Sequence, residues 1–189
     1  MRLSNHNYEI QITKDRQYTI FSTDDRFYDI IIETEGYNRN DFICAYSVSI
    51  QDSLRDRDYK VAIIGRAYGS VENSAVLEEN RLVVLVDNYL VFFDLTAQQL
   101  ENKILILDFG TGIEIYPFDE GYIVNGETDI IKVDKFGNKV WDFSGRDIWV
   151  RPNGEPSIKI LGDSLLLTDW EGNKYHLDKL GREISIDIT

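Results

Sequence analysis

The chain has 189 residues, of which 43% are hydrophobic and 12% aromatic, and its formal net charge is −13. This composition excludes a disordered chain, and the negative charge disfavours nucleic acid and an anionic membrane surface as partners. We therefore expect a single globular domain over residues 1–189, with no nucleic-acid or membrane partner.

Short β-type runs separated by turn residues dominate the chain. Within residues 1–66, runs at 41–50 and 59–64 flank a polar loop and predict a hairpin in a divergent first unit. Further β-branched and aromatic runs follow at 82–86, 90–93, 104–107, 122–124, 130–133 and 165–167. No 12-residue window has the apolar spacing of an amphipathic helix, so the sequence predicts an all-β fold.

Three segments repeat one pattern, in which an apolar strand ends in Asp and a turn and a second strand follow. The Asp residues are Asp94, Asp134 and Asp178. Each carboxylate can accept hydrogen bonds from backbone N–H groups two or three residues further on. Gly137 and Gly181 can adopt the positive φ that closes the turn. We predict that these five residues are structural turn residues.

This turn pattern, Asp-x-x-Gly followed by a polar and later an apolar residue, resembles the blade repeat of quinoprotein-like β-propellers. In that family a Trp often follows the turn and packs between blades. Trp141 holds this place after Asp134, Ser185 holds it in the last unit, and the unit of Asp94 lacks both the Gly and the Trp. The resemblance covers residues 80–189 and implies a β-propeller-type fold. We expect no cofactor.

The repeat predicts about four small antiparallel sheets of ~40–45 residues each, which is the blade length of propellers. The divergent unit is expected at 1–66, and the repeat units at about 69–107, 110–145 and 157–189. They could close into a four-bladed ring or form a partial propeller. An open end would expose strand edges and favour a homo-oligomer.

A second resemblance concerns the stretch 141–150 and the chain as a whole. Both are similar to uncharacterised bacterial proteins that are associated with contact-dependent toxin–immunity loci. This resemblance implies a binding role.

The residues of most enzyme mechanisms are missing. His6 and His176 are the only histidines, and no G-x-S-x-G elbow, P-loop or G-x-G-x-x-G motif is present. His176 lies in a strand and is expected to be a surface or hydrogen-bonded residue. The single cysteine, Cys44, excludes an intramolecular disulfide and a multi-cysteine zinc site, and we expect it to be buried. We expect no catalytic residue and no bound metal, and a cytoplasmic location.

The middle third of the chain, residues 61–120, carries three basic and ten acidic residues. This charge either keeps the surface solvated or attracts a basic partner. The candidate partner-binding residues are Arg146, Asp147, Trp149, Trp170, Asp119 and Glu120. The first three combine Arg and Trp on a connecting loop, as binding hot spots do. Alternatively, an Arg–Asp pair ties two sheets together and Trp149 fills the seam between them.

The sequence thus favours a non-catalytic bacterial protein that binds another, basic protein, and a toxin-neutralising immunity protein is the most concrete form of this hypothesis. One alternative is a carbohydrate- or small-ligand-binding propeller-like module, which could be a hydrolase. Another is a self-associating structural domain.

Overall fold

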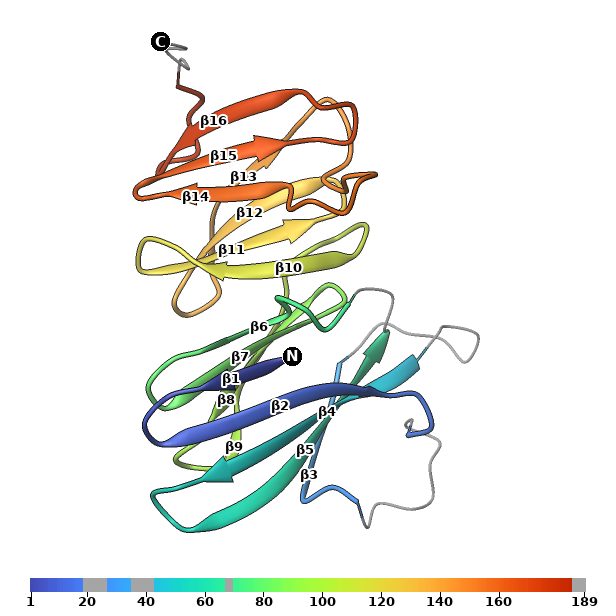
Figure 1. Ribbon diagram of the computed structural model, residues 1–189, viewed down its shortest axis with the longest axis vertical. Coiled ribbons are helices and arrows are strands. Elements are labelled where there is room, and N and C mark those ends of the chain that lie inside the picture. The colour runs from blue at the N-terminus through green and yellow to red at the C-terminus, as the bar shows by residue number, and fades with distance from the viewer. Residues whose placement is uncertain (19–26, 35–42, 67–69, 185–189) are drawn as a thin grey trace.

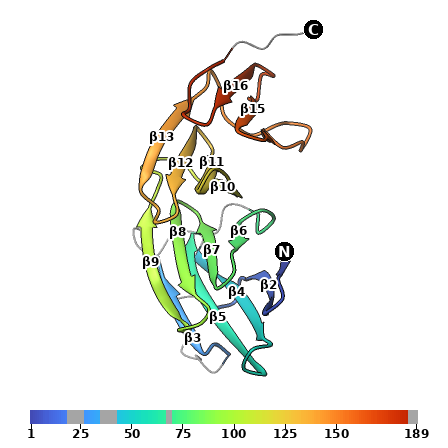
Figure 2. The same cartoon turned by 90° about the vertical axis from the view of Figure 1, so that its left-hand side faces the viewer.

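Figure 1 shows a computed structural model of the chain, which describes residues 1–18, 27–34, 43–66 and 70–184. The described residues form four sheets, named A to D in chain order, and contain no helix. The sheets stack one on the next and form an open, curved arc (Figure 2). The predicted all-β fold with four small sheets is confirmed, and the arc is that of a partial propeller. No described segment is a helix that could cross a membrane.

The strands are distributed over the sheets as follows. Sheet A holds β1 (Arg2–Ser4), β2 (Tyr8–Asp15), β3 (Ile30–Glu33), β4 (Ile43–Asp52) and β5 (Arg57–Arg66), in the spatial order β1-β2-β4-β5-β3. Sheet B holds β6 (Ala75–Leu77), β7 (Arg81–Val86), β8 (Tyr89–Asp94) and β9 (Gln99–Leu105). Sheet C holds β10 (Gly112–Pro117), β11 (Gly121–Gly126), β12 (Asp129–Asp134) and β13 (Lys139–Ser144). Sheet D holds β14 (Ile158–Leu161), β15 (Ser164–Thr168) and β16 (Lys174–Asp178).

Each sheet lies within one of the four predicted repeat units. The predicted start of the second unit at residue 69, and Ser185 with the end of the last unit, lie outside the described residues. Sheet A differs from the expected antiparallel pattern in one pair, because β3 runs parallel to β5. Strand β3 lies on the side of β5 that faces away from β4, and it runs in the same direction as β5.

Neighbouring sheets share apolar layers, and the inner sheets bury both of their faces. Strand β8 shows this best. Val91 and Phe93 pack into the layer shared with sheet A, whereas Leu90 and Phe92 pack into the layer shared with sheet C. A strand buried on both faces reads as a continuous apolar run without alternation, which explains the sequence of residues 90–93. Cys44 is fully buried in the layer between sheets A and B, as predicted.

In the turns of the repeat, the Asp carboxylates accept backbone hydrogen bonds. The Oδ1 atom of Asp134 accepts hydrogen bonds from the N–H groups of Phe136 (2.8 Å) and Asn138 (2.9 Å). In the turns of Asp94 and Asp178, the Asp carboxylate likewise accepts a hydrogen bond from the backbone N–H two residues further on. Gly137 and Gly181 have φ angles of 87° and 75°.

Two further hairpins have an Asp turn that the repeat pattern did not reveal. Asp52 accepts the N–H groups of Leu54 (3.0 Å) and Arg55 (3.2 Å) in the β4–β5 hairpin. Asp169 accepts the N–H of Asn173 (2.8 Å) in the β15–β16 hairpin. The Asp52 turn is closed by Asp56 at a φ of 48°, so it lacks the glycine that marks the pattern.

We expect Gly181→Ala to destabilise the protein more than Gly172→Ala does. The two glycines occupy the same place in equivalent turns, each three residues after the Asp and at positive φ. A Cβ on Gly172 would meet nothing within 4 Å, whereas a Cβ on Gly181 would lie 2.6 Å from the Trp141 ring. Gly172→Ala should therefore cost about 1–2 kcal/mol for the left-handed backbone, and Gly181→Ala about 1–3 kcal/mol more for overpacking. Urea unfolding of both variants measures the difference, and equal losses would contradict packing of Trp141 against the turn.

The Asp turns should also make stability depend on pH. Burial alone would raise the pKa of Asp134 and Asp169, but hydrogen bonds led by those from Asn138 and Asn173 outweigh it and lower both pKa values. A folded-state pKa below the unfolded value of about 3.9 stabilises the fold above that pH, and the stabilisation is lost as pH falls through the folded pKa. The Asp134→Asn, Asp169→Asn double variant should therefore lose less stability than the unmodified protein between pH 5 and pH 2. Asp108→Asn, in an exposed link, serves as the control in the same urea titrations.

Candidate functional site

Antiparallel pairing places successive turns at opposite edges of each sheet, so the stack has two rims. The hairpin rim, on the left in Figure 1, holds the Asp turns at 52–57, 94–99, 134–139 and 178–182 together with the short turns at 77–81, 117–121 and 161–164. The β1–β2 turn at residues 4–8 also lies on the hairpin rim, because Tyr8 pairs with Asp52. The loop rim holds the remaining turns and the links between sheets. Asp119 and Glu120 lie on the hairpin rim, and Trp170 lies on the loop rim.

At each seam of the hairpin rim, a side chain of one sheet donates a hydrogen bond to a backbone carbonyl in the Asp turn of the next sheet. We call these contacts seam clasps. The three donor–acceptor pairs are Arg55 Nη2 to Thr96 O (2.9 Å), Arg81 Nη1 to Lys135 O (2.9 Å) and Trp141 Nε1 to Lys179 O (3.0 Å). The contact of Trp141 with sheet D confirms the predicted packing of this residue between sheets.

A hollow of about 500 Å³, which we call the acidic groove, lies on the hairpin rim at sheet B. Its lining residues are Glu78, Glu79, Asn80, Arg81, Asp94, Thr96 and Glu101. Four carboxylates thus surround one guanidinium group. All of them come from the acidic middle third of the sequence.

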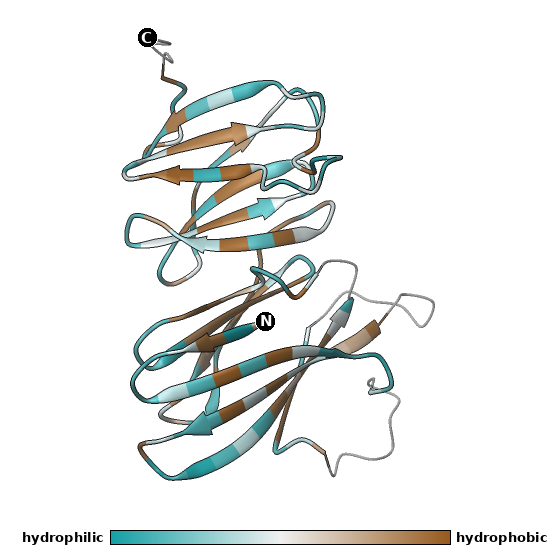
Figure 3. Ribbon diagram, viewed as in Figure 1, coloured by the Kyte–Doolittle hydropathy of each residue, from teal (hydrophilic) through white to brown (hydrophobic). Residues whose placement is uncertain are grey.

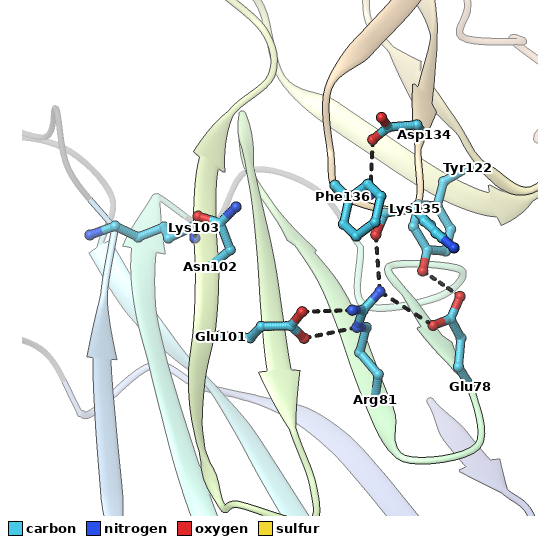
Figure 4. Close-up of polar contacts among 9 residues, drawn as sticks. All are labelled: Glu78, Arg81, Glu101, Asn102, Lys103, Tyr122, Asp134, Lys135 and Phe136. Carbon is cyan, nitrogen blue, oxygen red and sulfur yellow. Dashed lines mark hydrogen bonds and ion pairs between the residues drawn. The ribbon is translucent and has the colours of Figure 1, made fainter.

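Arg81 organises the groove, as Figure 4 shows. Its Nε and Nη2 atoms bind the two oxygens of Glu101 at 2.8 and 2.6 Å, and Nη1 lies 3.7 Å from Glu78. The Tyr122 hydroxyl donates to Glu78 Oε1 at 2.5 Å, and burial followed by this hydrogen bond raises the pKa of Tyr122. Arg81 therefore neutralises Glu101 and part of Glu78. The exposed Glu79 carboxylate has no hydrogen-bond or ion-pair partner within the described ranges.

Apolar side chains project at the tips of the Asp turns. Leu54, Phe136 and Leu180 each lie two residues after the turn Asp and are 60%, 57% and 53% exposed. The equivalent position in sheet B is Thr96, which lines the acidic groove. The seam clasps order the tips along the rim, so the groove lies between the tips of Leu54 and Phe136.

The structure separates the candidate residues that the sequence grouped. Asp119 and Glu120 form a tight turn with φ angles of 39° and 55°, and Asp119 lies 3.8 Å from Lys179 of sheet D. Trp170 lies on the β15–β16 turn and is 45% exposed. Because Trp170 lies on the opposite rim, these residues do not form one surface.

Trp149 fills the seam between sheets C and D, which was the alternative for this residue. It is 1% exposed, and its Nε1 donates to Thr128 O at 3.0 Å. A partner cannot reach it in this conformation. No ion pair joins Arg146 and Asp147 among the described residues; Asp147 Oδ1 accepts the N–H of Ile148 (2.8 Å), and the Arg146 backbone N–H donates to Tyr175 Oη (2.9 Å).

The described residues contain no group of three His, Cys, Asp or Glu side chains that could hold a metal ion. His176 Nε2 lies 2.9 Å from Ser164 Oγ, so it is the hydrogen-bonded strand residue that was expected. Sequence reasoning missed Arg81 and Glu101. The repeat gave a partial signal, since it places both next to an Asp turn, but their mutual contact depends on the pairing of β7, β8 and β9.

Comparison with known proteins supports the fold. No family model matches the chain, and no curated protein is similar to it. Similar solved structures are β-propeller proteins. BamB from Moraxella catarrhalis has a TM-score of 0.52 and 12% identity, over 82% of this chain and 48% of BamB. The dihydro-heme d1 dehydrogenase NirN in complex with DHE has a TM-score of 0.52 and 13% identity, over 76% and 34%. Kuenenia stuttgartiensis hydrazine synthase has a TM-score of 0.50 and 17% identity, over 89% and 51%. The chain thus spans about half or less of these three proteins.

The ion pair between Arg81 and Glu101 should contribute measurable stability. We expect a double-mutant cycle with Arg81→Met and Glu101→Gln to give a coupling free energy of about 1 kcal/mol, because the contact is bidentate and only partly exposed. The matched cycle on the exposed pair Lys139–Asp142 should give a value near zero. Urea unfolding at low and high salt measures both, and equal coupling energies would mean that the Arg81 contact is an ordinary surface pair.

Proposed function

We propose that this chain is a non-catalytic protein-binding module and that its hairpin rim binds a basic protein. The observation that carries the proposal is the acidic groove, in which four carboxylates surround a single arginine on a rigid seam between sheets. Such a charge distribution attracts cationic groups and speeds association with them.

The groove and the tips together indicate the chemistry of the partner. Glu79 offers a free carboxylate to a Lys or Arg side chain, whereas Glu101 is held by Arg81. Leu54 and Phe136 on either side offer exposed apolar contacts that would exclude water from that ion pair, as the surroundings of a hot spot do. The partner surface that fits is therefore a protruding basic residue flanked by apolar residues.

The most concrete form of the proposal is a toxin-neutralising immunity protein in a bacterial cytoplasm. An acidic, preformed rim suits a protein that must cover the basic surface of one particular partner. Opposed charges accelerate the encounter, and the Asp turns hold the tips in place before binding, which limits the entropy cost of association.

A pull-down from lysate of the source organism, repeated at raised salt and read by mass spectrometry, tests the proposal. We expect one basic protein to be captured at low salt and released at high salt. Glu79→Lys should reduce its capture at least tenfold, because the reversal places a second cation in the groove. Phe136→Ser should reduce it as well.

Asp108→Lys is the matched control, since it makes the same charge reversal at an exposed residue of a link on the loop rim. It should leave capture unchanged. Loss of capture in Asp108→Lys equal to that in Glu79→Lys would show that only the net charge matters. Capture of nothing, or capture that resists both Glu79→Lys and Phe136→Ser, would rule out the hairpin rim as the binding surface.

A further inference from the structure

A hollow larger than the acidic groove lies on the outer face of sheet A, at the end of the arc. Its volume is about 860 Å³, within the range of pockets that take small ligands, about 300–1,000 Å³. The side chains that face it are Arg2, Ser4, Glu9, Gln11, Ser49, Gln51, Asp58 and Lys60, with Phe27 and Asp29 at its margin. We call it the end-face groove.

The strand register arranges these side chains in two rows across β1, β2, β4 and β5. The first row is Ser4, Glu9, Gln51 and Asp58, and the second is Arg2, Gln11, Ser49 and Lys60. Neighbours within a row are about 4.5–5.5 Å apart, and the rows are two residues apart along the strands, or about 7 Å. Figure 3 shows the matching alternation of hydrophilic and hydrophobic residues along β2.

The strands that carry these polar groups are fixed by the core, and Asp29 accepts the backbone N–H of Lys60 (2.8 Å), but several of the side chains are unpaired. The other face of the same strands is fixed in the core by residues such as Ile10 and Ile50, which are almost fully buried. By contrast, the side chains of Glu9, Gln11 and Gln51 have no hydrogen-bond or ion-pair partner in the part of the chain that the structure describes. The groove therefore presents a preorganised array of unused donors and acceptors.

The neighbouring half of the outer face of sheet A is apolar and not polar. There Ala45, Ala62 and Ile64 form an apolar patch, and Tyr18 and Tyr28 pack with them. The chain thus covers the apolar part of the outer face with its own aromatic residues and leaves the polar part open. A polar end face could serve solubility alone. That role does not account for Phe27, which is 65% exposed at the margin of the hollow.

The composition of the array selects a class of ligand. Arg2 and Lys60 offset two of the three carboxylates of Glu9, Asp29 and Asp58, so the lining carries only a small net charge and does not select strongly for an ion. Carboxylates, amides and hydroxyls at these spacings can bind adjacent hydroxyl groups, and the exposed Phe27 ring can pack on an apolar C–H face. A sugar ring presents both features. We propose that the end-face groove is a binding site for a neutral oligosaccharide, separate from the acidic groove, with which it shares no lining residue.

Isothermal titration with maltoheptaose, cellohexaose and chitotetraose tests this proposal. We expect at least one of them to bind saturably with a 1:1 stoichiometry. Phe27→Ala and the Glu9→Ala, Gln51→Ala double variant should each weaken binding at least tenfold. Thermal unfolding of the variants shows that they remain folded, since these side chains lie on the surface.

Two controls separate this site from the acidic groove. Phe109→Ala removes an exposed aromatic ring from a link on the loop rim, and Glu79→Lys alters the acidic groove, so both should bind the saccharide unchanged. Absence of binding for all three saccharides, or binding that the groove variants do not weaken, overturns the proposal. Light scattering that shows a dimer dissociated by Gln51→Trp would also overturn it, because a second copy would then occupy the face.

Discussion

The fold depends on the aspartate that begins each of the four Asp turns on the hairpin rim. Its carboxylate accepts the N–H two residues further on in all four turns, at Leu54, Thr96, Phe136 and Leu180. This fixes the turn backbone, so that its carbonyl groups face the preceding sheet as acceptors for the seam clasps. The apolar faces of each sheet are buried only when the next sheet is held in place. One short-range interaction thus supports three long-range seams.

The local part of this design could be read from the sequence, and the long-range part could not. Asp134 and Gly137 were predictable because both halves of the turn lie within four residues. Asp52 was missed because Asp56 takes the positive φ without a glycine. Trp149 shows the other limit. Arg and Trp on a loop suit a hot spot and an inter-sheet seam equally well, and only the contacts of the Trp149 ring with Tyr175 and Thr128 decide between them.

The two rims explain why the candidate surface had to be redrawn. Turns alternate between the rims, so Asp119 and Trp170 are on opposite edges of the stack although both are turn residues in neighbouring sheets. This alternation follows from strand counting once the strands are known. The acidic groove does not follow in this way, because Arg81, Glu101 and Lys135 meet only when β7, β8 and β9 pair and sheet C docks on sheet B.

The outer faces of the two end sheets bear on whether the arc needs to close. In sheet A the outer face is polar or covered by Tyr18 and Tyr28. In sheet D, Lys159, Leu166 and His176 form the central outward row of the described residues. A face of this composition does not require another sheet to cover it, whereas the faces at the three seams are almost wholly apolar. The described arc can therefore remain open, with both ends in water, and its stability comes from the three seams.

The same reasoning shows where binding specificity can reside on this scaffold. In each Asp turn of the hairpin rim the Asp and the positive-φ residue are committed to structure, and in sheets B, C and D one turn carbonyl also accepts a seam clasp. The side chain two residues after the Asp is not committed, because that residue contributes only backbone groups: its N–H in all four turns and, for Thr96, also its carbonyl. That position holds Leu54, Thr96, Phe136 and Leu180, which differ in size and polarity while their backbones are held alike. The backbone of this row is fixed, but its side chains are free to vary. Substitutions in the row can therefore change which partner binds without changing the fold.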